Sequence, residues 1–128
     1  MRTAALLLLA LALAGCPTTT PQEIGIYGTT SAPPFRAAQV TNEDTEHSVA
    51  IARGVALGIS CWDSCDYTCK EPSFTVGNSD MLAVRPVYRQ GSTNPAWVLL
   101  ARSAGTTTLT VTSTCATQVY QVTVASPP

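Results

Sequence analysis

Alternation of large apolar residues with polar or small ones is the pattern that organises most of this chain. It is longest over residues 49–59, where Val49, Ile51 and Leu57 share one parity, and it predicts a strand bent at Gly54. Shorter β-rich runs cover residues 74–76, 81–84, 97–101, 106–114 and 119–124, with turn residues between them, and the last two of these runs alternate in the same way. Short strands divided by turns predict an all-β sandwich of about seven strands.

The first sixteen residues follow a different pattern. Arg2 precedes an unbroken apolar run over residues 4–14, and this run leads into Gly15 and Cys16. The order, ending in Leu13-Ala14-Gly15-Cys16, resembles the lipobox of bacterial lipoprotein precursors. The resemblance implies that residues 1–15 are a signal peptide, that a diacylglyceryl group is attached to the Cys16 thiol, and that the new amino group is acylated. Cys16 is therefore the expected lipidation site, and this covalent lipid is the only cofactor expected.

Three other interpretations of the N-terminus are weaker, and one of them, a buried core helix, is disfavoured by the position at the extreme N-terminus. Residues 12–14 also fit an ordinary secretory cleavage site, which would release a soluble protein. A membrane-spanning helix needs roughly 18–20 apolar residues, more than this run provides.

As a lipoprotein, the chain would be exported and anchored in the cell envelope. Pro17 is not the aspartate that retains lipoproteins at the inner membrane in some bacteria, so the outer membrane is favoured.

Composition suggests the domain organisation and excludes one class of partner. Residues 16–34 are rich in Thr, Pro and Gly and predict a linker, with one short edge strand near Ile26, ahead of a domain at residues 35–126. The net charge is −1 and no basic patch appears, so nucleic-acid binding has no electrostatic basis. The expected partners are the membrane, through the lipid, and envelope or surface proteins; no small-molecule substrate is indicated.

Three segments of the C-terminal half carry a second resemblance. Residues 75–84 (TVGNSDMLAV), 104–111 (AGTTTLTV) and 119–124 (VYQVTV) are similar to the bacterial immunoglobulin-like domains of group 2. The likeness covers about residues 49–125 and departs from the family at residues 58–73, where a cysteine-bearing insertion replaces a simple turn. It implies an immunoglobulin-like β-sandwich, and known members are mostly spacer or adhesive modules rather than enzymes.

Besides Cys16, the chain has four cysteines: Cys61, Cys65, Cys69 and Cys115. An even number is expected of a disulfide-bonded domain outside the cytoplasm. Four cysteines allow three pairings, and in each of them Cys115 bonds one of the close trio while the other two bond each other. Because Cα atoms in a disulfide lie within about 7 Å, residues 61–69 must form a loop or short helical turn. A metal site using these thiols and His47 is disfavoured, because the spacing lacks closely paired ligands.

Within the cysteine loop, Trp62 and Tyr67 are the candidate partner-binding residues, because a rigid disulfide frame would present them. Their alternative role is to cover the end of the sandwich and shield the disulfides. Asp63 and Asp66 are interpreted as solubilising loop residues. Trp97, which begins an apolar strand, is expected in the core or at its rim. The acidic cluster of Glu43, Asp44 and Glu46 is interpreted as a solvated turn rather than a calcium site.

The sequence shows no phosphate-binding glycine loop, paired catalytic carboxylates or serine–histidine arrangement, so the chain is not expected to be an enzyme. We expect a lipid-anchored cell-envelope protein whose immunoglobulin-like domain is a structural, adhesion or protein-binding module. The alternative is an envelope protease inhibitor that presents the disulfide-rigid loop, an idea that rests on architecture alone.

Overall fold

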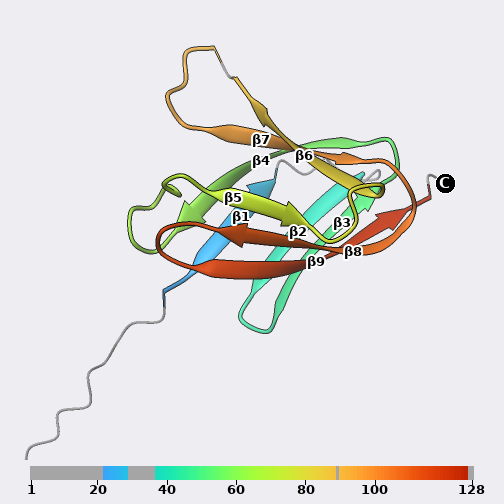
Figure 1. Ribbon diagram of the computed structural model, residues 1–128, viewed down its shortest axis with the longest axis horizontal. Coiled ribbons are helices and arrows are strands. Elements are labelled where there is room, and N and C mark those ends of the chain that lie inside the picture. Colours follow the sequence, from blue (N-terminus) through green and yellow to red (C-terminus); the bar gives the residue numbers. More distant parts are fainter. Residues whose placement is uncertain (1–21, 29–36, 89, 127–128) are drawn as a thin grey trace, which may run out of the picture.

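The computed structural model describes residues 22–28, 37–88 and 90–126, which form a sandwich of two β-sheets (Figure 1). One sheet has the strand order β1-β4-β7-β6, and the other has the order β2-β3-β9-β8-β5. The predicted all-β sandwich is confirmed, with nine strands in the described residues. Their bounds are β1 Ile24–Gly28, β2 Ala38–Glu43, β3 Glu46–Ala52, β4 Ala56–Asp63, β5 Ser73–Val76, β6 Leu82–Val87, β7 Ala96–Ala101, β8 Gly105–Thr112 and β9 Thr117–Ala125.

The strand order is that of an immunoglobulin-like fold. With β1 as strand A and β4 to β9 as strands B to G, the two sheets contain A-B-E-D and C-F-G. The chain enters the second sheet at its edge strand β2, and β3 then pairs in parallel with β9 from Ser48 opposite Gln121 to Ala52 opposite Ala125. The number of strands exceeds the predicted seven for two reasons. The first strand of the immunoglobulin-like fold is divided into β1 in one sheet and β3 in the other, and β2 forms an additional hairpin with β3.

The single bent strand predicted over residues 49–59 is wrong. The chain instead turns at Gly54, where φ is 84°, so β3 lies in one sheet and β4 in the other. In this turn the Gly54 amide donates to the Ala101 carbonyl at 2.8 Å, and the Val55 amide donates to the Ala52 carbonyl at 3.1 Å. Both strands face the same core from opposite sides, so the alternation of large and small residues continues across the turn and hides it.

Side chains from both sheets fill the core. Phe74 and Trp97 pack across it with ring centroids 4.9 Å apart, which places Trp97 at the rim of the core. Burying each large aliphatic side chain stabilises the fold by about 1.5–3 kcal/mol. The most fully buried large apolar residues are Tyr120, Ile26, Ile51, Leu82, Leu99, Leu109, Val49, Val111 and Val122.

The sandwich begins earlier than residue 35. Strand β1 lies inside the segment expected to be a linker, yet Ile24 and Ile26 are buried and β1 pairs antiparallel with β4 from Ile24 opposite Asp63 onward. The expected edge strand near Ile26 is therefore a structural strand of the domain. Residues 1–21, which include the expected signal peptide and Cys16, lie outside the described residues. Within the part of the chain that the structure describes, no helix is long and apolar enough to cross a membrane.

Candidate binding site

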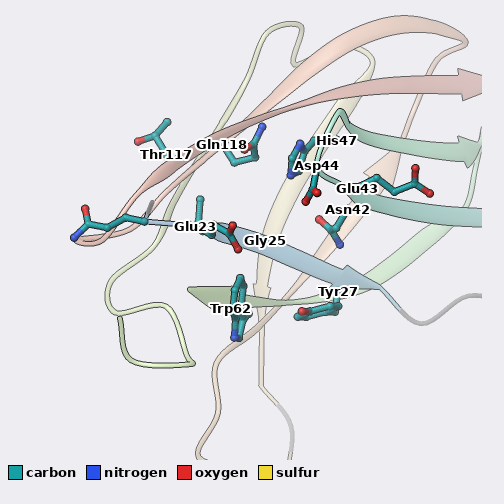
Figure 2. A pocket seen from close by; sticks show the side chains of 12 residues that line it. Glu23, Gly25, Tyr27, Asn42, Glu43, Asp44, His47, Trp62, Thr117 and Gln118 are labelled. Atoms are coloured by element: carbon teal, nitrogen blue, oxygen red, sulfur yellow. The ribbon is translucent and has the colours of Figure 1, made fainter. Parts of the chain in front are cut away.

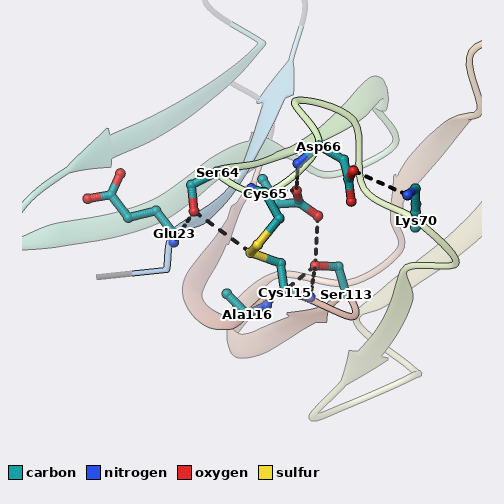
Figure 3. Close-up of a disulfide and its surroundings, with 9 residues drawn as sticks. Glu23, Ser64, Cys65, Asp66, Lys70, Ser113, Cys115 and Ala116 are labelled. Atoms are coloured by element: carbon teal, nitrogen blue, oxygen red, sulfur yellow. Dashed lines mark hydrogen bonds and ion pairs between the residues drawn. A yellow bond between two sulfur atoms is a disulfide. The ribbon is translucent and has the colours of Figure 1, made fainter. Parts of the chain in front are cut away.

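Two disulfides cross-link one end of the sandwich, and Figure 3 shows the one between Cys65 and Cys115. Cys61 bonds Cys69, with Cα atoms 5.4 Å apart, and Cys65 bonds Cys115, with Cα atoms 6.0 Å apart. The first bond closes the loop that follows β4, and the second joins this loop to the β8–β9 turn, 50 positions away. This is one of the three pairings that the sequence leaves open. Disulfides of this kind indicate an oxidising, extracytoplasmic environment.

Asp63 organises the backbone at this end and is not a solubilising residue, because its side chain is inaccessible to solvent. Its Oδ1 accepts the Cys65 amide at 3.2 Å and the Asp66 amide at 3.0 Å, and its Oδ2 accepts the Ser113 hydroxyl at 2.9 Å. Burial alone would raise the pKa of Asp63, but these hydrogen bonds, with a small contribution from the Lys70 charge, hold that pKa below its usual value.

Serine side chains complete the cross-linking between the three segments. The Glu23 amide, just ahead of β1, donates to Ser64 Oγ at 2.9 Å, and Ser64 Oγ lies 3.7 Å from Cys115 Sγ. Ser113 Oγ accepts the Cys115 amide at 3.1 Å. We call this region of Glu23, residues 63–65 and residues 113–115 the braced end. Asp63, Cys65 and Cys115 form a compact group, but both sulfurs are bonded to each other and the carboxylate is occupied, which leaves no metal ligand set.

A groove of about 510 Å³ lies beside the braced end, between β1, the β2–β3 hairpin and the start of β9 (Figure 2). Figure 2 shows Trp62 and Tyr27 on one side of β1, with His47, Asp44 and Asn42 on the other. We call it the acidic groove. It is lined by Gln22, Glu23, Ile24, Gly25, Tyr27, Asn42, Glu43, Asp44, His47, Trp62, Thr117 and Gln118.

A closed ring of hydrogen bonds lies next to the acidic groove and reaches its lining through Asn42. The Ile26 amide donates to the Tyr120 hydroxyl at 3.0 Å, that hydroxyl donates to Asn42 Oδ1, and Asn42 Nδ2 donates to the Ile26 carbonyl at 2.8 Å. Burial raises the pKa of Tyr120 above its usual value, against the opposing effect of the Ile26 amide, so the phenol stays protonated and can donate. The His47 ring meets the Tyr120 ring edge-on, with centroids 5.5 Å apart.

A second, mostly apolar groove of about 350 Å³ adjoins the first on the outer face of the four-stranded sheet. Tyr27 lines both grooves and is 55 % exposed. We call this hollow the apolar groove. Its lining residues are Tyr27, Gly28, Gly58, Ile59, Ser60, Val87, Ala96 and Trp97.

The structure separates the two aromatic residues predicted to act together. Trp62 lies in β4 opposite Gly25, is half-buried, and lines the acidic groove. Tyr67 lies on the loop, is 79 % exposed with a φ of 62°, and lines neither groove. A role for either residue in partner binding stays a prediction. Sequence reasoning missed Tyr27, Asn42 and Tyr120, because Asn42 and Tyr120 are 78 positions apart and no local pattern marks them.

The three acidic residues of the predicted solvated turn lie at the β2–β3 hairpin, where Glu43 pairs with Glu46. Glu43 and Asp44 line the acidic groove, whereas Glu46 accepts the Ser48 hydroxyl at 2.8 Å. The turn therefore contributes two carboxylates to the acidic groove, which the sequence of the turn alone does not predict.

No family model matches this chain, and comparison with curated proteins and with solved structures finds no match. The fold and the two grooves are thus the basis on which a function is argued.

Proposed function

We propose that this protein is a lipid-anchored cell-envelope protein whose immunoglobulin-like domain is a protein-binding module. The N-terminal motif ending at Cys16 supports the anchor, and the two disulfides support export to an oxidising compartment. We further propose that the domain is a divergent relative of the group 2 bacterial immunoglobulin-like domains. This is supported by the strand order and by Gly105, whose φ of 140° suits glycine at the link between β7 and β8.

The observation that carries the binding role is the meeting of two grooves at Tyr27, beside an end of the sandwich held by two disulfides. Concave sites with aromatic walls and a few polar groups are typical of binding surfaces. A scaffold that is already rigid loses little conformational entropy when a partner docks, which favours affinity.

Mass spectrometry of the mature N-terminal peptide tests the anchor. We expect a peptide that begins at Cys16 and carries the mass of a diacylglyceryl group and an N-acyl chain. The Cys16→Ala variant is expected to lose membrane association. An unmodified peptide beginning at Gly15 would refute lipidation.

Site-specific photocrosslinking in intact cells tests the binding role. A benzophenone amino acid placed at Tyr27 is expected to form an adduct with a defined envelope protein. The same probe at Tyr88 is the matched control, because Tyr88 is 88 % exposed and lines neither groove. Equal adducts from both positions, or none from Tyr27, would contradict a binding role for the grooves.

Protease inhibition by the disulfide loop remains the second proposal. The loop between β4 and β5 places Tyr67 and Glu71 at positive φ, so it consists of turns and presents no extended segment to a protease cleft. We therefore rank it below the groove. Titration of the purified protein against a panel of proteases tests it, and the absence of inhibition at micromolar concentration would remove it.

A further inference from the structure

We infer that the two grooves bind one segment of a partner protein in which a bulky apolar residue lies close to a lysine or arginine. This inference rests on the proposed binding function and names the chemistry of the partner. It follows from the charge of one groove, the apolar lining of the other, and the residue that joins them.

The acidic groove gathers negative charge from two separate parts of the chain. Glu23 comes from the start of β1, while Glu43 and Asp44 come from the β2–β3 hairpin. All three side chains are exposed, and no lysine or arginine is among the described residues that line the groove. A cation entering this groove would meet complementary charge from both sides, which favours positively charged partners.

The arrangement of these groups suits an organic cation better than a metal ion. Metal sites need several ligand atoms that converge on one point, and among residues 22–28, 37–88 and 90–126 the only such group includes none of the groove carboxylates. The groove also has Trp62 and Tyr27 on its wall, and aromatic faces attract guanidinium and ammonium groups through cation–π interactions. A lysine or arginine side chain uses both features.

The apolar groove provides the second half of the site. Its hollow arises because Gly58 and Ser60 of β4 are small and point to the outer face of the sheet, between Tyr27 on one side and Val87 with Ala96 on the other. Val87 is 37 % exposed, so apolar surface is left uncovered there. A leucine-sized or larger apolar side chain gains free energy by covering that surface.

Tyr27 fixes the relation between the two halves, because it lines both grooves. A partner that fills both must therefore carry its cation and its apolar side chain within a short stretch of chain. This requirement distinguishes a peptide segment from a free polyamine, which has no apolar group to place.

Peptide titration monitored by tryptophan fluorescence tests the inference, since the Trp62 side chain lines the acidic groove. The probes are Ac-Gly-Leu-(Gly)n-Arg-Gly-NH2 peptides with one to four central glycines, added to the oxidised, full protein isolated in detergent. We expect at least one spacing to bind saturably. Two changes in the peptide are each expected to weaken binding about tenfold: replacement of Arg by its neutral isostere citrulline, and replacement of Leu by Ser.

Variants of the protein assign each effect to its groove. The double variant Glu23→Gln/Asp44→Asn is expected to abolish the difference between Arg and citrulline but keep the difference between Leu and Ser, and Val87→Ser is expected to do the reverse. Glu71→Gln is the matched control, because Glu71 is an exposed acid outside both grooves, and it is expected to change neither. A higher salt concentration is expected to weaken binding of the Arg peptide but not binding of the citrulline peptide.

Equal binding of the Arg and citrulline peptides, or no binding of any peptide up to about 5 mM, would overturn the inference. Peptide binding that appears only when a dimer is diluted would assign the grooves to a second copy of the chain, and would also overturn it. Failure of the envelope function is distinguishable, because it removes the crosslink from position 27 but leaves the peptide selectivity intact.

Discussion

Asn42 and Tyr120, which are 78 positions apart in the sequence, are joined by a hydrogen bond that ties the two sheets together through Ile26. Asn42 and Tyr120 belong to β2 and β9 of the five-stranded sheet, and Ile26 belongs to β1 of the four-stranded sheet. The ring occupies the Ile26 amide and carbonyl on the side of β1 that faces away from β4. It therefore closes the edge of β1 at this point and holds Asn42 in place at the lining of the acidic groove.

Tyr120→Phe is expected to destabilise the protein by about 1–3 kcal/mol, because the buried Ile26 amide and the Asn42 oxygen lose their shared partner. The free energy of unfolding from urea denaturation measures this. Tyr88→Phe removes the same hydroxyl from a residue that is 88 % exposed, and it is expected to change stability by less than about 0.5 kcal/mol. Equal effects of the two variants would show that the ring contributes nothing.

The two disulfides are expected to differ in their contribution to stability. In the chain-entropy model, loss of the Cys65–Cys115 bond, with a sequence separation of 50, costs about 4 kcal/mol, whereas loss of the Cys61–Cys69 bond, with a separation of 8, costs about 2.5 kcal/mol. Paired Cys→Ser variants of each bond, compared by chemical denaturation, measure the difference. A larger loss from the shorter loop would mean that native-state contacts, rather than loop entropy, dominate.

Asp63 is expected to make stability depend on acid pH. Because its pKa in the folded protein is lower than in the unfolded chain, its contribution is present above the unfolded value of about 3.9 and is lost as the pH falls through the lower folded value. Asp63→Asn is therefore expected to lower the melting temperature at neutral pH, by an amount that shrinks as the pH falls below the unfolded value. Asp66→Asn, at an exposed position paired only with Lys70, serves as the control with little effect. A deficit that stays constant with pH would contradict the role of the charge.

Gly105→Ala is expected to destabilise the sandwich by about 1–3 kcal/mol, because φ is 140° and an added Cβ would lie 2.6 Å from Met81 Cε. Gly54→Ala provides the comparison, since Gly54 also has a positive φ but open space around it. Shortening the neighbour with Met81→Ala in the Gly105→Ala background separates the steric effect from the backbone strain in a double-mutant cycle. Fully additive losses would mean that Met81 gives way without cost.

The sequence predicts the class of fold because apolar and polar residues alternate along the long strands, most clearly over residues 106–114 and 119–124. It predicts a short strand near Ile26 but assigns that strand to the linker, because five residues with two glycines among Thr- and Pro-rich neighbours are typical of a tether. Only the burial of Ile24 and Ile26 shows that β1 belongs to the domain. The turn at Gly54 was hidden because strands of opposite sheets share one inward parity.

The candidate site was less predictable than the fold. The acidic hairpin and Trp62 each carry a signal in the sequence, but their meeting with Glu23 and Tyr27 depends on how β1 lies against the β2–β3 hairpin. The prediction that Asp63 is a solubilising residue is wrong because a carboxylate beside a loop cysteine is usually exposed, whereas this one is buried. Its hydrogen bonds to the Cys65 and Asp66 amides form an Asx-type turn, which is the local signal that could have revealed it.

The hydrogen bond between the Glu23 amide and Ser64 has a consequence for orientation. It fixes the start of β1 at the braced end, whereas β9 carries the chain to Ala125 at the opposite end of the sandwich (Figure 1). Seven positions separate Cys16 from Glu23, a contour of at most about 25 Å. A lipid at Cys16 would thus hold the braced end of the domain close to the bilayer, with the C-terminal end of β9 pointing away from it. Such a protein would keep its grooves close to the lipid surface. It would meet its partners by lateral diffusion within the membrane plane and would not reach far beyond the bilayer.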